Sequence, residues 1–442
     1  YHSDQRTAEA FNKTYGIVHP REQWATNRNV RVSPFYNAEK ELGAVFFETA
    51  GWERPQWYAS NEKLLEEFGD RVMPRTNEWD SRWWSPIINA EHLAMRERVG
   101  MVDLTALAIF DVMGPGALAY MEKMAMAKMD VPIGRGVYTP ILTYSGGFKS
   151  DLTIMRLGEK HFRVITGGSD GPRDMKWFRN HLPADDSVFM VDLTSAYCTI
   201  GVWGPKSREL LQSLTKSDMS DAGFPFGWTK KIRIDGVEIL AFRISYVGEL
   251  GWELYIPMEQ GLGIGTKIWD AGQAFGVVPV GIGVYGTTGR LEKGYRLMSA
   301  ELDADYSPVE AGLARPKVKS ADFIGKAGYL KAREERPTAV LCTLTVEDNT
   351  SKSGEKRYIQ GGEPILTLDG ETIQDAKGRY AYATSAGDAP SLGKQILLAY
   401  LPLQYANIGE NLYVEYMGQN YPVTVRSIDS TPVFDPNNER MK

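Results

Sequence analysis

The apolar residues of this chain change their spacing once, close to Pro316. Between Ile87 and Pro316, amphipathic helical patterns alternate with strand-like apolar runs. From Ala339 onward, short apolar runs are separated by Gly, Asp and Asn turns, a pattern typical of an all-β, barrel-like domain. We therefore expect an α+β chain with a lead-in segment over residues 1–85, a core of mixed helices and antiparallel strands over 86–335, and a C-terminal β-barrel domain over 336–442.

Composition and charge narrow the class of protein. The 442 residues are 43% hydrophobic and 24% charged, which excludes disordered, collagen-like and coiled-coil classes. A net charge of -6 without a basic stripe predicts no nucleic-acid partner. Membrane association is not expected either, because no run approaches the roughly 20 apolar residues that span a bilayer. Cys198 and Cys342 lie in apolar runs and fit buried free thiols in a reducing compartment, the cytoplasm or, in a eukaryote, the mitochondrial matrix.

Motifs for metal binding and for serine nucleophiles are missing from the sequence. The five histidines are isolated, and neither HExxH nor paired cysteines occur, so we expect no metal site. No GxSxG elbow is present. The segment Gly281–Gly286 does match GxGxxG, with acidic Glu301 further on, and leaves two alternatives. It is either a dinucleotide site or the tight packing of a strand-to-helix turn, and its position far along the chain favours packing.

Two hairpin segments carry candidate functional side chains. Asp151 follows the Gly146-Gly147 turn and opens a strand, where a carboxylate is placed for chemistry or, alternatively, accepts hydrogen bonds from turn amides. Tyr246 and Glu253 lie seven positions apart around two glycines. If both face one cavity, the tyrosine offers a stacking surface and the glutamate can accept two parallel N–H bonds from an aminopyrimidine edge. The alternative is core packing plus a surface carboxylate.

Several blocks in order and spacing resemble the folate-binding T protein of the glycine cleavage system, an aminomethyltransferase. They are VGMVDLTALAIFDVMGPGA, VYTPILTYSGGFKSDLTIMRL, YCTIGVWGPKSRELL, RISYVGELGWELYIP, GRLEKGYR and SPVEAGLARPKVK. QGGEPILTL, YATSAGDAPSLGKQILLAYL and VFDPNNERMK resemble the C-terminal barrel of that family. Upstream, RVSPFYNAEKELGAVFFETAGWERPQWY is similar to the segment that joins the flavin and folate domains of dimethylglycine and sarcosine dehydrogenases.

The resemblance implies a tetrahydrofolate site and assigns its residues. Asp151 would be the catalytic carboxylate that faces the reactive folate nitrogens. Four further residues would bind the folate: Tyr138, Tyr246, Glu253 and Arg290. The block from Asp103 to Leu107 departs from the T-protein pattern at Leu107, where that family has a methionine, and this departure argues against the aminomethyl-lipoyl substrate.

For function, the resemblance implies formation of 5,10-methylenetetrahydrofolate. The carbon would come from the iminium or formaldehyde that oxidative demethylation of an N-methyl amine produces, dimethylglycine or sarcosine for example, as in glycine betaine catabolism. FAD is expected only on an N-terminal half or a partner oxidase subunit, since the chain begins at Tyr1, about where a flavin half would end. Two alternatives stay open: a free-standing folate-dependent demethylase and a non-catalytic regulatory subunit of the same architecture.

Overall fold

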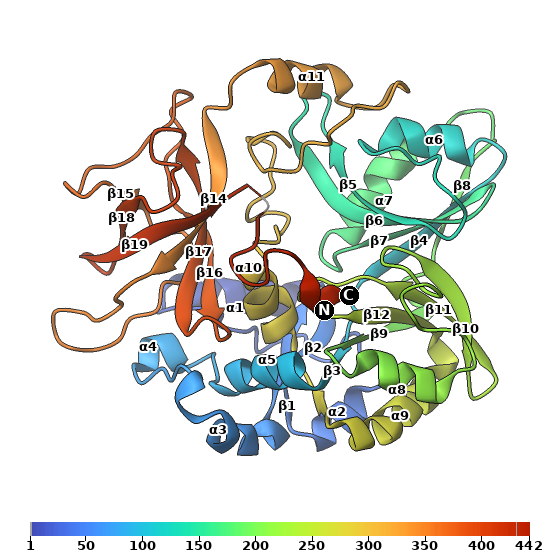
Figure 1. Ribbon diagram of the computed structural model, residues 1–442, viewed down its shortest axis with the longest axis horizontal. Helices are drawn as coiled ribbons and strands as arrows, with labels where there is room; N and C mark the ends of the chain where they lie inside the picture. Colours follow the sequence, from blue (N-terminus) through green and yellow to red (C-terminus); the bar gives the residue numbers. More distant parts are fainter. Residues whose placement is uncertain (1, 430) are drawn as a thin grey trace.

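The computed structural model describes residues 2–429 and 431–442, whose sheets form three lobes around a common centre (Figure 1). The N-terminal segment begins with a helix and continues into a two-stranded hairpin between short helices. These elements are α1 (His2–Thr14), α2 (Tyr36–Glu41), β1 (Ala44–Thr49), β2 (Trp52–Tyr58), α3 (Lys63–Phe68) and α4 (Glu78–Ser81).

Helix α5 (Ile87–Glu97) leads into the first large sheet, which has six strands in the order β10-β11-β12-β9-β3-β13. All neighbours are antiparallel except β13 and β3, which run parallel. Helices α8 (Ser207–Leu214) and α9 (Gly261–Gly272) add Leu211 and Ile264 to the core on one face of this sheet. The strands are β3 (Val99–Asp103), β9 (Tyr197–Trp203), β10 (Thr229–Ile234), β11 (Val237–Arg243), β12 (Gly251–Pro257) and β13 (Val277–Pro279).

The second sheet has five antiparallel strands in the order β5-β6-β7-β4-β8. Its apolar core includes Phe110 and Val164 from the strands and Met121 and Phe178 from the helices that cover it. The elements are β4 (Ala108–Met113), α6 (Ala117–Met124), β5 (Gly136–Leu142), β6 (Phe148–Gly158), β7 (His161–Thr166), α7 (Gly171–Asn180) and β8 (Phe189–Asp192).

Strands β3 and β4 are consecutive in the chain but belong to different sheets. The apolar run that carries both is interrupted by a four-residue turn, where Asp103 accepts a hydrogen bond from the Thr105 amide at 2.8 Å. The Leu107 amide donates to the Leu104 carbonyl at 2.9 Å. An Asp side chain that bonds the backbone two residues on favours a turn over a continuing strand. Residues 104–107 are therefore one of two short connections between the first and second sheets; residues 193–196, between β8 and β9, are the other.

The third sheet, reached through α11 (Lys326–Glu334), confirms the predicted C-terminal all-β domain. It is a curled, half-barrel sheet of six strands in the order β15-β18-β19-β14-β17-β16. The strands are β14 (Ala339–Val346), β15 (Ile365–Leu366), β16 (Ala383–Ala389), β17 (Lys394–Pro402), β18 (Asn411–Tyr416) and β19 (Gln419–Ile428). Together with the two preceding sheets, it confirms the predicted α+β class.

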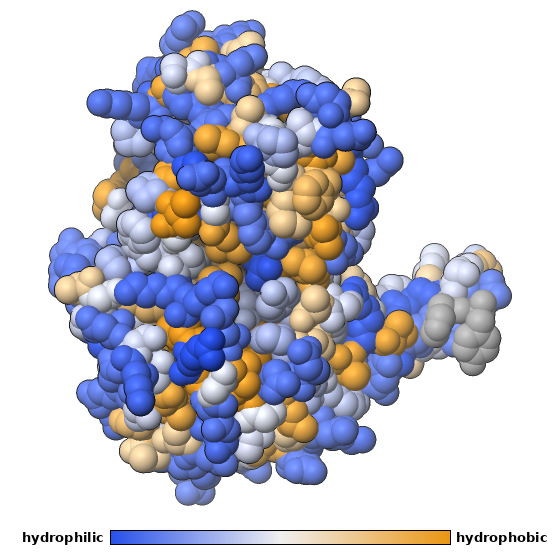
Figure 2. Space-filling model, turned by 90° about the vertical axis from the view of Figure 1, so that its right-hand side faces the viewer, coloured by the Kyte–Doolittle hydropathy of each residue, from blue (hydrophilic) through white to orange (hydrophobic). Residues whose placement is uncertain are grey.

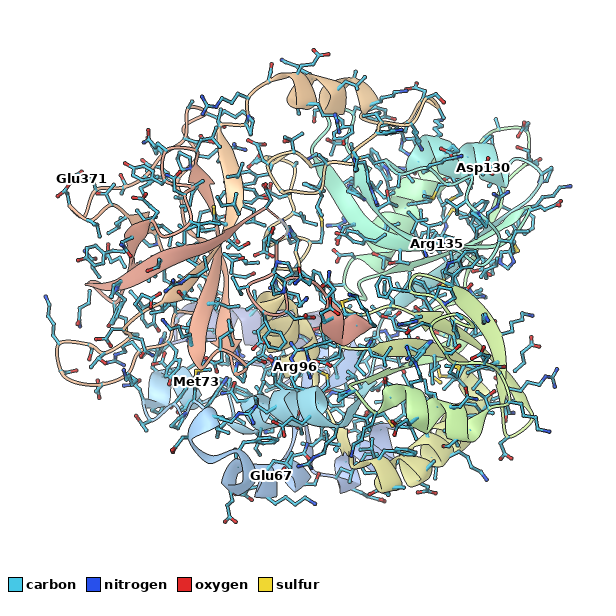
Figure 3. All side chains as sticks on the ribbon, in the orientation of Figure 1. Glu67, Met73, Arg96, Asp130, Arg135 and Glu371 are labelled. Carbon is cyan, nitrogen blue, oxygen red and sulfur yellow. The ribbon has the colours of Figure 1, made fainter. Side chains whose placement is uncertain are left out.

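A buried ionic network occupies the centre of the molecule, where Figure 3 labels Arg96. The Arg96 guanidinium donates to Glu249 and to Glu292, each at 2.9 Å, and His92 Nε2 lies 3.1 Å from the Glu292 carboxylate. Glu292 belongs to the short helix α10 (Arg290–Glu292). Breaking a buried pair by removing one partner leaves an uncompensated charge, so this network holds α5, α10 and the loop before β12 in one arrangement.

The C-terminal tail folds back onto the same centre. The Leu250 amide donates to the Arg440 carbonyl at 2.8 Å, and the Arg440 guanidinium contacts Glu249 and the Arg96 carbonyl. Lys293 reaches the Asp435 carbonyl at 2.7 Å. The loop over residues 244–250 is thus held by residues that follow it by almost 200 positions.

Hydrophilic and hydrophobic residues are interspersed over the face shown in Figure 2. Within residues 2–429 and 431–442, no helix is both long and apolar enough to cross a membrane. Cys198 and Cys342 are both buried and free. No group of three or more His, Cys, Asp or Glu in the described chain could hold a metal ion.

Candidate functional site

Asp151 and Tyr138 lie on neighbouring strands of the second sheet. Asp151 on β6 pairs with Pro140 on β5, and Tyr138 lies two residues before Pro140, on the same face. The Tyr138 hydroxyl donates a hydrogen bond to Asp151 Oδ2 at 2.9 Å, although 37% of the tyrosine surface is exposed. Burial raises the pKa of Asp151 to about 6, against the lowering effect of the Tyr138 hydrogen bond. The pair therefore presents a carboxyl group that titrates near neutral pH.

Tyr246 lies in the loop over residues 244–250, between β11 and β12. Its hydroxyl donates to the Arg296 carbonyl at 2.6 Å. Its ring stacks on Tyr295, with centroids 5.7 Å apart and planes 14° apart, and contacts the Tyr285 ring at 5.1 Å. The predicted aromatic surface is therefore a group of three rings, in which one face of Tyr246 is covered by Tyr295.

Glu253 lies on β12, opposite Gly201 of β9. Strand alternation places Trp252 and Leu254 in the core beneath α8 and α9, so Glu253 faces the other side of the sheet. The glutamate is 7% exposed and accepts a hydrogen bond from the Tyr255 hydroxyl. Burial raises the pKa of Glu253 to about 7, and the Tyr255 hydrogen bond acts in the opposite direction.

Arg290 opens helix α10 and is 4% exposed. Its guanidinium donates to the carbonyls of Gly286 and Tyr295, to Glu301 at 3.2 Å, and to Ser385 Oγ at 2.8 Å. A guanidinium has five N–H donors, so these bonds leave at most one for a ligand. Since Ser385 belongs to β16, Arg290 also links the centre to the C-terminal sheet.

Electrostatic interactions link the five predicted site residues to one another, directly or through Tyr285. The charge of Asp151 raises the pKa of Tyr246, and the charge of Arg290 lowers it, although burial is the largest influence. Tyr138 also interacts with Tyr246. On the other side, Glu253 and Tyr246 both raise the pKa of the buried Tyr285. The cluster thus combines residues of the second sheet, the first sheet and helix α10.

Several contributors to the cluster were not predicted from the sequence, among them Tyr255, Tyr285, Tyr295 and Arg296. Tyr255 could have been found, because it lies two residues after Glu253 in a strand and so shares its face. Tyr285 lies inside the GxGxxG segment, whose pattern is defined by its glycines and gives no role to the residue at this position. Arg296 gives no sequence signal, since its guanidinium bonds the backbone carbonyls of residues 294, 311 and 429, which only the fold brings together.

The GxGxxG segment supports the packing alternative. A Cβ atom on Gly281 would lie 2.1 Å from the Gln56 carbonyl oxygen, and one on Gly283 would lie 2.8 Å from the same atom. The Gly281 amide donates to the buried carboxyl of Glu91 at 2.9 Å. The glycines thus allow β2 to pack closely against the turn after β13. The Glu301 carboxylate, the acidic residue of the dinucleotide alternative, already accepts a hydrogen bond from Arg290.

Chemically, the cluster combines three functions around one centre. Asp151 can accept or release a proton near neutral pH, because its pKa of about 6 lies close to the operating range of a general base. Glu253 can accept two parallel N–H bonds, and Tyr246 and Tyr285 supply aromatic surface. Such a set suits a planar heterocycle that carries an amino-substituted edge.

Three family models match parts of this chain. A model described as GCVT N-terminal domain matches residues 35–318, and one described as Glycine cleavage T-protein C-terminal barrel domain matches residues 341–435. A third, FAD dependent oxidoreductase central domain, matches residues 2–33.

Several curated proteins are similar to the chain over most of its length. Mitochondrial dimethylglycine dehydrogenase of Mus musculus is 31% identical over 429 residues, which are 95% of this chain and 46% of that protein. 4-Methylaminobutanoate oxidase (formaldehyde-forming) of Paenarthrobacter nicotinovorans is 30% identical, over 99% of this chain and 50% of that protein. The aminomethyltransferase of Halothermothrix orenii is 27% identical, over 87% and 95%. The chain spans about half the length of the dehydrogenase and oxidase relatives.

Among solved structures, aminomethyltransferase T of the glycine cleavage system from Bartonella henselae superposes with a TM-score of 0.73. The match covers 90% of this chain and 97% of that one, at 20% sequence identity, and shows a common fold. Because the first family model covers residues 35–318, more than half of the chain, and the second covers the C-terminal sheet, this chain belongs to the glycine cleavage T-protein family.

Proposed function

We propose that this chain catalyses a tetrahydrofolate-dependent one-carbon transfer and forms 5,10-methylenetetrahydrofolate. The carbon would come from oxidative demethylation of an N-methyl amine such as dimethylglycine or sarcosine. The observation that carries the proposal is Asp151, a carboxylate with a pKa of about 6 held by Tyr138 in one cluster with the predicted folate residues. The names of two relatives, a dimethylglycine dehydrogenase and a formaldehyde-forming oxidase, support the source of the carbon.

The residues of the cluster fit a reduced folate. The pterin ring presents an aminopyrimidine edge with two parallel N–H groups, and the Glu253 carboxylate can accept both. Tyr255 orients this carboxylate from the same strand face. Tyr246 and Tyr285 offer ring faces beside it, and Arg290 has at most one donor left, so its role is to hold the centre in place.

The chemistry that tetrahydrofolate supplies when bound is a pair of nitrogens that take up the one-carbon unit. The Asp151 carboxylate accepts the proton that this step releases, while Tyr138 orients its Oδ2 atom. General-base assistance of this kind contributes about 10²–10⁴-fold to a rate. Binding residues that hold the reacting groups together would replace a bimolecular encounter by an oriented one.

A flavin oxidase is the partner in this proposal. FAD would belong to an N-terminal half or a separate subunit, supported by the match of residues 2–33 to an FAD dependent oxidoreductase central domain. Residues 1–85 would then link the oxidase to the core over 86–335 and the barrel domain over 336–442. The mitochondrial names of some relatives support a reducing compartment, the mitochondrial matrix or the cytoplasm.

Anaerobic calorimetric titration with tetrahydrofolate tests the proposal. We expect micromolar binding to the purified protein and at least a tenfold loss in Glu253→Ala. Glu238→Gln is the matched control, because it removes an exposed carboxylate from β11, the strand next to β12 in the same sheet. Full affinity in Glu253→Ala, or no binding to a folded wild-type protein, would contradict a folate site and favour the regulatory alternative.

A further inference from the structure

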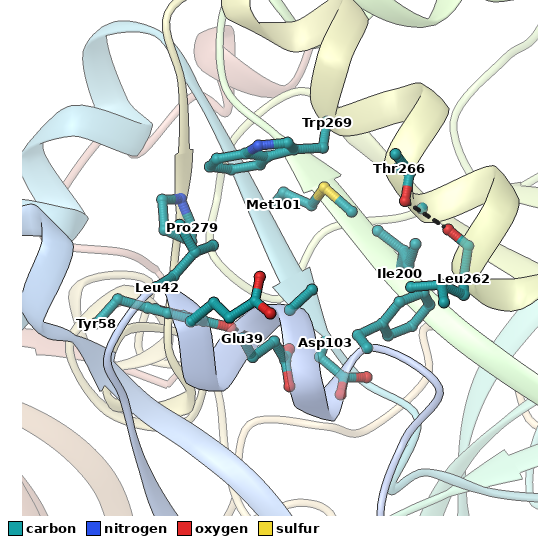
Figure 4. Close-up of a pocket in the computed structure, with 14 residues that line it drawn as sticks. Glu39, Leu42, Tyr58, Met101, Asp103, Ile200, Leu262, Thr266, Trp269 and Pro279 are labelled. Atoms are coloured by element: carbon teal, nitrogen blue, oxygen red, sulfur yellow. Dashed lines mark hydrogen bonds between the residues drawn. The ribbon is translucent and has the colours of Figure 1, made fainter.

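A pocket of about 310 Å³ lies between the N-terminal segment and the helix-covered face of the first sheet. Glu39 and Glu41 of α2 and Tyr58 of β2 line it from the N-terminal segment. The sheet and α9 contribute residues that include Met101, Asp103 and Trp269. Figure 4 shows the two acids Glu39 and Asp103 on one side and Trp269 with Met101 on the other.

This pocket is separate from the cluster around Asp151. Asp103 of β3 pairs with Ile200 of β9, and cross-strand partners share a face, here the face packed by α9. Glu253 pairs with the next residue of β9, Gly201, and therefore faces the opposite side. The first sheet thus separates the pocket from the cluster.

Glu39 carries a carboxylate oxygen that the protein leaves unsatisfied. The residue is 7% exposed, and the Tyr58 hydroxyl donates to its Oε1 at 3.0 Å. Its Oε2 is buried and has no hydrogen-bond partner within the described part of the chain. A buried polar oxygen without a hydrogen-bond partner costs free energy, so Oε2 marks a place where a polar or positively charged partner is missing.

The ionisable side chains around Glu39 that can carry a charge near neutral pH are all acidic. Asp103 and Glu41 also line the pocket, and none of the described residues that line it is Lys, Arg or His. Most of the remaining wall is apolar and includes the indole of Trp269 and the thioether of Met101. Carboxylates with an aromatic face and aliphatic walls favour a cation that carries apolar substituents over a hydrated metal ion.

We propose that this pocket binds a small organic cation, an alkylated ammonium, with Glu39 as its counter-ion and Trp269 as its aromatic contact. The pocket's size, at the lower end for small-molecule sites, suits an ammonium with a few carbon atoms. The inference does not depend on folate binding, because it uses neither Asp151 nor Glu253.

Proton release provides a second signature of this binding. Burial raises the pKa of Glu39 well above its usual value, and the charge of Asp103 raises it further, against the Tyr58 hydrogen bond. The other ionisable group facing the pocket is Glu41, at its rim. A cation beside Glu39 favours the ionised carboxylate, so binding at neutral pH releases a proton.

The test is calorimetric titration with tetramethylammonium chloride at constant ionic strength, in two buffers of different ionisation enthalpy. This probe carries no titratable proton, so any proton released comes from the protein. We expect binding at least tenfold weaker in Glu39→Gln and about three- to tenfold weaker in Trp269→Leu, as lost charge pairing and cation–π contact predict. Neutral 2,2-dimethylpropan-1-ol, of similar shape, serves as the uncharged probe.

Glu371→Gln is the matched control for net charge. Glu371 is exposed and lies at the outer edge of the C-terminal lobe (Figure 3), so its loss should leave the affinity unchanged. Saturating tetrahydrofolate should not displace the probe. Equal binding of the neutral alcohol, or wild-type affinity in a folded Glu39→Gln protein without a change in proton release, overturns the proposal, as does the absence of probe binding. Trp269→Leu keeps the test decisive if Glu39→Gln fails to fold.

Discussion

Tyr138 Oη and Asp151 Oδ2 are joined by a 2.9 Å hydrogen bond between neighbouring strands of the second sheet. The bond stabilises the ionised carboxylate and so counteracts the burial that raises its pKa to about 6. The Tyr138 hydroxyl therefore lowers the pKa of Asp151, whereas burial raises it.

Removing this hydroxyl should shift the pH dependence of the reaction. In Tyr138→Phe the Asp151 carboxylate loses its hydrogen bond, so its pKa should rise above about 6. Because the base must be ionised, the acid limb of the pH–rate profile should move to higher pH, which steady-state rates between pH 5 and 9 would show. An unshifted limb would mean that another group titrates.

Replacing the carboxylate itself should separate binding from chemistry. Asp151→Asn keeps the size and polarity of the side chain, so tetrahydrofolate affinity should stay within a few-fold of wild type. Formation of 5,10-methylenetetrahydrofolate from tetrahydrofolate and formaldehyde should fall by about 10²–10⁴-fold, as loss of a general base predicts. Asp235→Asn, at an exposed hairpin turn, is the control. Unchanged turnover in Asp151→Asn would remove this residue from the mechanism.

Glu253 makes folding stability depend on pH. Its folded-state pKa is about 7, against 4.5 for an unperturbed glutamate, so the folded protein binds this proton more tightly than the unfolded chain. The stabilisation is fully present below pH 4.5 and is lost as the pH rises through 7.

Glu253→Gln removes this titration. Relative to wild type, the variant should gain on the order of 2–3 kcal/mol in unfolding free energy between pH 4.5 and pH 8. Urea unfolding of both proteins at the two pH values measures the difference. The same change relative to wild type at both values would contradict the raised pKa.

The variant Gly281→Ala tests whether the glycines of the GxGxxG segment are needed for close packing. An added Cβ would lie 2.1 Å from the Gln56 carbonyl oxygen, so Gly281→Ala should destabilise the protein by about 1–3 kcal/mol or more through overpacking. Gly263→Ala in α9 is the matched control, since a Cβ there meets no atom within 4 Å. Thermal unfolding would compare them, and equal midpoints would show that the close approach is not needed for packing.

Local patterns predicted much of the fold. The Gly146-Gly147 turn between β5 and β6 and the all-β pattern after Ala339 depend on neighbouring residues, and both are present. The break at residues 104–107 was not predicted, because the apolar run continues through the turn and only the Asp103 side chain interrupts the strand.

Asp151 and Glu253 could be named as candidates from the sequence because one turn or one strand carries each pattern. Their raised pKa values could not be predicted, because these depend on burial by residues distant in sequence. The pocket around Glu39 gave no signal for the same reason: its walls come from α2, β2, β3, β9, α9 and β13, and each contributes unremarkable residues.

The contact between the C-terminal tail and the loop over residues 244–250 has a consequence for biosynthesis. The Arg440 carbonyl accepts a hydrogen bond from the Leu250 amide, and the Arg440 guanidinium pairs with Glu249. Both partners lie in the same loop as Tyr246. A ribosome synthesises this loop long before it reaches Arg440. Both large sheets of the core can therefore form on the emerging chain, whereas the loop that carries Tyr246 gains its final support only after residue 440 has left the exit tunnel.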